Sequence, residues 1–341
     1  MGVQVAKPDL STAAAGEAVV TVEDLRIHFA TRDGQTVKAV DGVSFAIRAG
    51  ETFGIIGESG SGKTTVGRAL VGLLRPSGGR ILYGDRDVGS LSTREYRRLR
   101  RDYQIIFQDP HAALNPRMTI LSSMVEPLEI LGEGTADSRR RIALEALERA
   151  GLAPEIAARY PHELSGGQKQ RVNIARALTL RPKFIVCDEV VAALDVSIRG
   201  DILNLFAELQ RELGLTYAFI THDISVVAHI SDRVGVMYLG RLAELGPAEA
   251  VTERPLHPYT QALLSAEPIP LPSDLRNKNK RIRLSGEIPS PVSPPSGCRF
   301  RTRCPAATER CAQQAPEWRE LAPDHWVACH FATPDGPPTA A

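Results

Sequence analysis

The chain has 341 residues, of which 41 are Lys or Arg and 40 are Asp or Glu, so its formal net charge is +1. Single cores stop growing at roughly 250–300 residues, so this length predicts one large core and a smaller appended unit. The balanced charge gives no electrostatic reason to expect nucleic acid or an anionic membrane as a partner. No run approaches the ~18 apolar residues of a membrane span, and residues 1–17 lack the layout of a secretory signal, so we expect a cytosolic chain.

Hydrophobic spacing predicts an alternation of strands and helices after a loose, small and polar tail at residues 1–15. The expected strands are residues 19–29, 37–47, 52–57, 78–84, 103–107, 184–187, 217–220 and 233–238. The expected helices are residues 62–74, 93–101, 139–149 within a helical region, and 198–213. The later alternation is typical of parallel βαβ units, so the sequence predicts an α/β fold. Residues 255–295 are rich in proline and polar residues and predict a linker.

A phosphate-binding loop is predicted at residues 57–64, which read Gly-Glu-Ser-Gly-Ser-Gly-Lys-Thr between a predicted strand and a predicted helix. Its glycines let consecutive backbone N–H groups turn toward phosphate oxygens, and the helix adds its positive end. Lys63 supplies a point charge and Thr64 a hydroxyl for Mg²⁺. We therefore predict that ATP and Mg²⁺ bind here. The residues assigned to this loop are Gly57, Ser59, Gly60, Ser61, Gly62, Lys63, Thr64 and Thr65.

A second phosphate-binding device appears at residues 164–168, where Leu-Ser-Gly-Gly-Gln precedes an apolar-faced helix. With this motif the chain resembles the ATP-binding cassette (ABC) family over about residues 18–255. The resemblance implies that the signature closes over the nucleotide held by a partner protomer in a head-to-tail dimer. It also implies a P-loop NTPase fold with a RecA-like core, an antiparallel β subdomain and a helical signature subdomain. The signature residues are Ser165, Gly166, Gly167 and Gln168.

Two adjacent acids, Asp188 and Glu189, end the apolar run 184–187. Acids at the end of a buried strand are costly unless a metal and a reacting group use them. The family resemblance implies that Asp188 joins the Mg²⁺ shell and that Glu189 is the base that activates water. Cys187 lies within the same run, where we expect its thiol to act as a small hydrophobe.

Four further positions resemble elements of the family's nucleotide site. Gln108 matches the glutamine that senses Mg²⁺ and water, and His222 matches the histidine that contacts the γ-phosphate. Phe29 stands where the family stacks an aromatic ring on adenine. Asp195 matches the aspartate of the loop that links the two sites, but relatives of this type usually carry serine where this chain has Ala192. We expect the site to be competent for hydrolysis, with communication across the dimer weakened.

Segments outside the ATPase motifs indicate a transporter subfamily. Residues 109–119 and 257–264 resemble the ATPases of dipeptide and oligopeptide importers, and residues 115–119 and 185–189 resemble the F-type subunit. The resemblance implies a D-type partner ATPase, two membrane permease subunits, an extracytoplasmic substrate-binding protein and a place at the cytoplasmic face of the membrane, without nucleic acid. Dipeptides, longer peptides, glutathione, nickel complexes or other small solutes remain open as cargo. The alternative is a soluble ABC ATPase that acts on nucleic acid or ribosomes.

The last predicted unit contains four cysteines in a C-x5-C-x6-C-x17-C pattern. In a reducing compartment, clustered cysteines indicate metal ligands rather than disulfides. Four thiolates suit an iron–sulfur cluster or tetrahedral Zn²⁺, and the pattern resembles an extension that holds a [4Fe-4S] cluster in some peptide-importer ATPases. Unligated thiols are the third interpretation. The cysteines are Cys298, Cys304, Cys311 and Cys329.

The interleaved Arg299, Arg301 and Arg303 have two interpretations, as charges that compensate a negative cluster or as a solvated basic face. The resulting domain prediction is a flexible tail (1–17), an ABC ATPase domain (18–254), a proline-rich linker and peptide-importer segment (255–297), a cysteine-rich metal-binding extension (298–331) and a tail (332–341).

Overall fold

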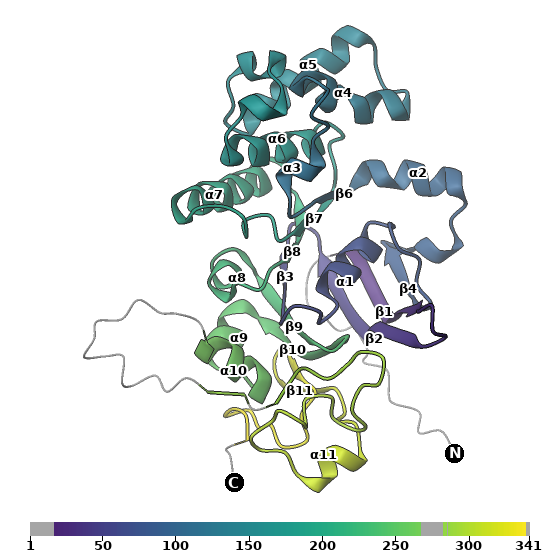
Figure 1. Cartoon of the computed structure of the whole chain (residues 1–341), viewed down its shortest axis with the longest axis vertical. Coiled ribbons are helices and arrows are strands. Elements are labelled where there is room, and N and C mark those ends of the chain that lie inside the picture. Colours follow the sequence, from purple (N-terminus) through teal and green to yellow (C-terminus); the bar gives the residue numbers. More distant parts are fainter. Residues whose placement is uncertain (1–16, 267–281, 285, 339–341) are drawn as a thin grey trace, which may run out of the picture.

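The computed structural model describes residues 17–266, 282–284 and 286–338 (Figure 1). The predicted tail at residues 1–15, part of the predicted linker and the last three residues of the predicted C-terminal tail lie outside the described residues. Within the described part, no helix combines the length and the apolar character needed to cross a membrane.

A four-stranded antiparallel sheet, in the order β2-β1-β4-β5, opens the fold. Its strands are β1 (Ala18–Ala30), β2 (Thr36–Arg48), β4 (Gly78–Tyr83) and β5 (Arg86–Asp87). The alternation along β2 buries Val40, Phe45 and Ile47 on one face, and Val20 of β1 pairs with Ile47. Because this face is buried, the register of the pair is fixed by its apolar set.

The central eight-stranded sheet has the order β11-β12-β10-β9-β3-β8-β7-β6. Its strands are β3 (Thr52–Ile56), β6 (Tyr103–Ile106), β7 (Phe184–Asp188), β8 (Thr216–Ile220), β9 (Arg233–Tyr238), β10 (Arg241–Pro247), β11 (Arg319–Ala322) and β12 (His325–Val327). Strands β9, β3, β8, β7 and β6 run parallel. Every residue of β3, β7, β8 and β9 is buried, which explains their continuous apolar runs.

Helices cover this sheet and form a separate group above it in Figure 1. They are α1 (Lys63–Leu70), α2 (Thr93–Asp102), α3 (Pro110–Ala113), α4 (Ile120–Leu131), α5 (Ala136–Arg149), α6 (Gly166–Leu178), α7 (Val196–Leu213), α8 (Ile224–Ile230), α9 (Ala248–Glu253), α10 (Pro258–Ala266) and α11 (Glu309–Gln313). Short 3₁₀ turns lie at Val88–Ser90, Pro154–Ala158 and Pro161–Glu163. In the upper group, α4, α5 and α6 share one apolar core with β7, α7 and β8.

Two sequence predictions were wrong about element bounds. Helix α1 ends at Leu70 instead of residue 74, because Gly72 adopts φ +70° and the N–H of Leu73 bonds back to Arg68 O, which closes the helix. The predicted linker contains helix α10, whose Tyr259 is fully buried. Proline is tolerated in the first turn of a helix, so Pro258 begins this helix instead of preventing one.

The cysteine-containing region joins the main sheet. Strand β12 pairs with β10 through Glu244–Val327 and Leu245–Trp326, and β11 pairs with β12 at the edge. Figure 1 shows this region below β9 and β10, with α10 beside it. Strands β11 and β12 of this region therefore extend the central sheet.

Candidate nucleotide-binding site

The loop between β3 and α1 has the close backbone contacts that require glycine. Gly57 has φ +151° and Gly62 has φ +106°, in the region that favours glycine. A Cβ on Gly57 would lie 2.2 Å from Met237 O, and one on Gly62 would lie 2.3 Å from Ala39 O. Neighbouring backbone thus holds the loop on two sides, while Gly60 is exposed at its tip.

Lys63 begins α1 and extends back over this loop. Its Nζ donates to Gly57 O at 2.7 Å and to Glu58 O at 3.0 Å. Burial lowers the pKa of Lys63, and the carboxylates of Glu189 and Asp188 act in the opposite direction. Beside it, Ser61 Oγ is buried with no hydrogen-bond partner among the described residues. A buried cation and an unpaired hydroxyl are the groups that phosphate oxygens would satisfy.

Thr64 and Asp188 meet at the end of the sheet, although 124 residues separate them. Thr64 Oγ1 donates to Asp188 Oδ1 at 2.9 Å. Burial raises the pKa of Asp188; the hydrogen bond from Thr64 acts against this, and the carboxylate of Glu189 adds to it. A hydroxyl beside a carboxylate is a donor set that suits Mg²⁺, and a cation there would favour the ionised form of Asp188. The residues therefore fit the predicted Mg²⁺ site.

Glu189 lies where three loops converge. Gln108 Nε2 donates to Glu189 Oε2 at 2.9 Å, and His222 Nδ1 lies 3.4 Å from Glu189 Oε1. Glu189 has φ +51°, and its N–H is held by Ile220 O at 2.8 Å. A non-glycine residue in this conformation costs on the order of 1–3 kcal/mol and is typical of functional sites. The structure thus brings together the predicted base, the predicted glutamine and the predicted histidine.

The signature residues lie apart from this loop. Ser165 caps α6 by two hydrogen bonds with Gln168. Its Oγ accepts from Gln168 N–H at 3.3 Å, and its own N–H donates to Gln168 Oε1 at 3.0 Å. Ser165 and Gly166 are exposed, and Gly167 is buried against Ile198 of α7. Figure 1 shows α6 in the upper helical group, well separated from α1. The N-terminus of α6 is therefore exposed and is not part of the chain's own phosphate loop.

Three other predicted positions have distinct surroundings. Phe29 is 41 % exposed near the end of β1, and the exposed Asp195 lies at the N-cap of α7 without a side-chain capping bond. Thr65 follows Thr64 in the first turn of α1. Cys187 is fully buried in β7 and burial raises the pKa of its thiol, which confirms that it packs as a small hydrophobe.

The four C-terminal cysteines line one small cavity together with His257 and His330. Burial raises the pKa of Cys298 to about 11, and the other three thiols add to this shift. Burial also raises the pKa values of Cys304 and Cys329. Among the described residues, however, no three His, Cys, Asp or Glu side chains stand close enough to hold a metal ion. The metal cluster therefore stays a prediction.

The interpretation of the basic residues in this segment as a solvated face was wrong for Arg299 and Arg303. Each has a side chain only 9 % exposed, so neither belongs to a solvated face. Arg299 pairs with Asp41, and Arg303 pairs with Glu58 of the phosphate loop at 2.6 Å. Local sequence pattern carries no signal for these pairs, because their members are 258 and 245 residues apart.

Comparison with known proteins matches residues 40–192 to the ABC transporter family and residues 243–311 to the family of the oligopeptide/dipeptide transporter C-terminal region. The oligopeptide transport ATP-binding protein AppF of Bacillus subtilis is 51% identical over 327 residues, with 94% of this chain and 99% of that protein covered. The chain belongs to the family of oligopeptide-transporter ATP-binding proteins.

Other members and solved structures of ABC proteins are similar to it. The oligopeptide transport ATP-binding protein OppF of Salmonella typhimurium is 50% identical over 310 residues, covering 88% of this chain and 92% of that protein. The dimeric ATP-binding cassette MJ0796, bound to ADP and Pi, has a TM-score of 0.61 at 31% identity, over 67% of this chain and 98% of that chain. The transporter component cbiO1 of Clostridium perfringens has a TM-score of 0.62 at 33% identity, over 69% and 90%. The ABC ATPase fold of this family member is thus shared with solved cassettes.

Proposed function

We propose that this chain is the ATP-hydrolysing subunit that powers import of peptides through a membrane ABC transporter. The observation that supports this proposal most strongly is that Gln108 and His222 both lie against Glu189, beside the Thr64–Asp188 pair. The printed names of the relatives AppF and OppF, both oligopeptide transport ATP-binding proteins, support peptides as the cargo class.

The roles of the site residues follow from their positions. Lys63 and the backbone N–H groups of residues 57–65 would bind the phosphates, and Thr64 and Asp188 would hold Mg²⁺, which would neutralise phosphate charge. Glu189 accepts a proton from the attacking water, and Gln108 keeps its carboxylate oriented. His222 is 59% exposed, so it is free to turn from Glu189 toward a γ-phosphate.

A second ATPase subunit completes the site. The exposed Ser165 and Gly166 at the N-terminus of α6 offer a hydroxyl and backbone N–H groups to an anion on another molecule. We infer a head-to-tail heterodimer with a D-type subunit, in which each signature covers the partner's nucleotide and Asp195 lies near the dimer interface. The dimeric state of the similar cassette MJ0796 supports this arrangement.

The permease subunits are proposed to dock in a groove between the sheet and the helical group. This groove has a volume of about 850 Å³ and is lined by Phe107, Gln108, Ile130 and Arg176 among others. Phe107 is 40% exposed and Ile130 67%, which leaves apolar surface for a short amphipathic segment of the permease. Because Gln108 lines the groove and bonds Glu189, docking there would act directly on the base. This proposal places the chain at the cytoplasmic face of the membrane.

The cysteine cavity is proposed to hold an iron–sulfur cluster, with Zn²⁺ as the alternative. Four soft thiol donors, all among the described residues, line one cavity, although as they lie no three of them stand close enough to hold an ion, so metal binding would have to draw them together as thiolates. A bound metal would stabilise those thiolates and link residues 298–331 into one unit. Iron, sulfide and zinc analysis of anaerobically purified protein distinguishes the alternatives, and absence of all three would refute the proposal.

We also propose the following domain boundaries: an ATPase domain at 18–254, a connecting importer segment at 255–297, the metal-binding extension at 298–331, and tails at 1–17 and 332–341.

Reconstitution of the chain with its cognate permeases and binding protein in vesicles tests the transport function. ATP-dependent uptake of a labelled oligopeptide is the expected result. Co-purification with ribosomes or DNA, without any permease, would instead favour the soluble ABC ATPase.

A further inference from the structure

Residues 298–304 pack against the phosphate loop through an ion pair between the buried Arg303 and the partly buried Glu58. Arg303 donates from Nη1 to Glu58 Oε2 at 2.6 Å and from Nη2 to Glu58 Oε1 at 3.0 Å. The guanidinium also lies 5.8 Å from the centre of the Tyr238 ring. A two-bond contact of this kind fixes direction as well as distance.

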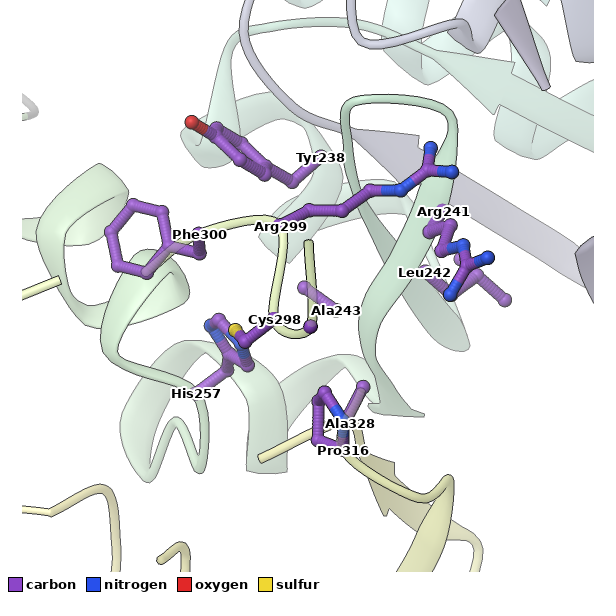
Figure 2. A pocket seen from close by; sticks show the side chains of 11 residues that line it. Tyr238, Arg241, Leu242, Ala243, His257, Cys298, Arg299, Phe300, Pro316 and Ala328 are labelled. Atoms are coloured by element: carbon purple, nitrogen blue, oxygen red, sulfur yellow. The ribbon is translucent and has the colours of Figure 1, made fainter. Parts of the chain in front are cut away.

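The same loop residue is held through its backbone. Glu58 N–H donates to Tyr259 Oη at 2.8 Å, and Tyr259 is completely buried. Its ring is packed between Tyr238, at 4.7 Å, and Phe300, at 5.3 Å, measured between ring centres. In Figure 2, the Phe300 ring lies on the same side as Tyr238 and His257, while the Arg299 side chain extends in the opposite direction, toward Arg241.

A second contact reaches the loop through the turn between β9 and β10. Arg299 donates to Leu239 O and to the carboxylate of Asp41. In that turn, Gly240 N–H donates to Ser61 O at 2.8 Å and Gly240 O accepts from Asp41 N–H at 2.8 Å. The C-terminal segment therefore supports the loop at Glu58 directly and at Ser61 through one intermediate turn.

We propose that Arg303 is a positioning residue for ATP binding, which acts on the phosphate loop through Glu58. Glu58 O accepts a hydrogen bond from Lys63 Nζ, so a shift of Glu58 moves both the loop backbone and the lysine that binds phosphate. Binding groups need placement within about 0.5 Å, and removing one partner of this partly buried pair leaves the other charge without its counter-ion. This inference rests on the assignment of residues 57–65 to phosphate binding.

Titration of the full-length protein with a fluorescent ATP analogue tests the proposal. Arg303→Gln should raise the Kd about tenfold, Arg303→Lys should restore part of the affinity, and Tyr259→Phe, which removes only the acceptor oxygen, should weaken binding in the same direction. Arg310→Gln is the matched control, because Arg310 also directly precedes a cysteine but is exposed. In the assembled transporter the KM for ATP should rise while kcat stays within about twofold, because Glu189 and its partners are untouched.

A Glu58→Gln/Arg303→Gln double variant should bind no more weakly than the worse single variant, because the two residues act as one unit. A wild-type Kd in Arg303→Gln, or an equal loss in Arg310→Gln, would overturn the proposal. If Arg303→Gln does not fold, a wild-type Kd in Tyr259→Phe would overturn it. Lys63→Ala separates this inference from the proposed function: binding that survives Lys63→Ala refutes the phosphate-loop assignment itself.

Discussion

Replacement of Glu189 by glutamine removes one negative charge from a position that two side chains and one backbone carbonyl define. Gln108 is 2.9 Å away and His222 is 3.4 Å away, and the backbone is held by Ile220 O at 2.8 Å. Glutamine has nearly the same shape, so the variant should keep the geometry and lose the ability to accept a proton. Loss of a general base removes about 10²–10⁴-fold of rate.

The expected result for Glu189→Gln is therefore a fall of that size in kcat for ATP in the assembled transporter, with ATP affinity retained because Lys63, Thr64 and Asp188 are intact. Single-turnover hydrolysis measures the chemical step, and analogue titration measures binding. Glu212→Gln serves as the control, since the Glu212 side chain is 64% exposed and its nearest cation is 3.8 Å away. A kcat within threefold of wild type would refute the assignment of Glu189 as the base.

Further predictions concern the signature, the loop and the cysteines. Ser165→Asp keeps a good N-cap but places a negative charge opposite the partner's phosphate, so ATP turnover of the assembled complex should fall about 10²-fold. Thr135→Asp, at the N-cap of α5, is the control and should leave this turnover unchanged. Gly62→Ala, which puts a Cβ 2.3 Å from Ala39 O, should lower the free energy of unfolding by about 1–3 kcal/mol in urea titration, whereas Gly200→Ala in α7, with open space around it, should not. Cys304→Ser should reduce bound iron or zinc to background, and wild-type metal content would contradict the ligand assignment.

The parts of the fold that the sequence predicted are those governed by local pattern. Strands β3, β7, β8 and β9 are buried on both faces, so their apolar runs were visible in the sequence. Strands β11 and β12 carry mixed polar residues and exist because β10 offers an edge to pair with, which local pattern does not encode. Helix α10 was hidden by the prolines around it.

The candidate site shows the same division. Glycine spacing and the acids after an apolar run identified the loop and Asp188 with Glu189, because those motifs are continuous in the chain. The pairing of Glu58 with Arg303 depends on how the C-terminal segment folds back, and no sequence period reports it. The resemblance to a family supplied Gln108 and His222, but only the structure places both on Glu189.

We infer that the nucleotide bound by this chain is hydrolysed only when a second ATPase subunit covers it. The most direct measurement is the steady-state ATP turnover of the purified chain, confirmed as a monomer by light scattering, before and after addition of the D-type subunit and permeases. We expect a low rate for the monomer alone and at least a tenfold rise on assembly. A monomer that hydrolyses ATP at the rate of the complete transporter would contradict it.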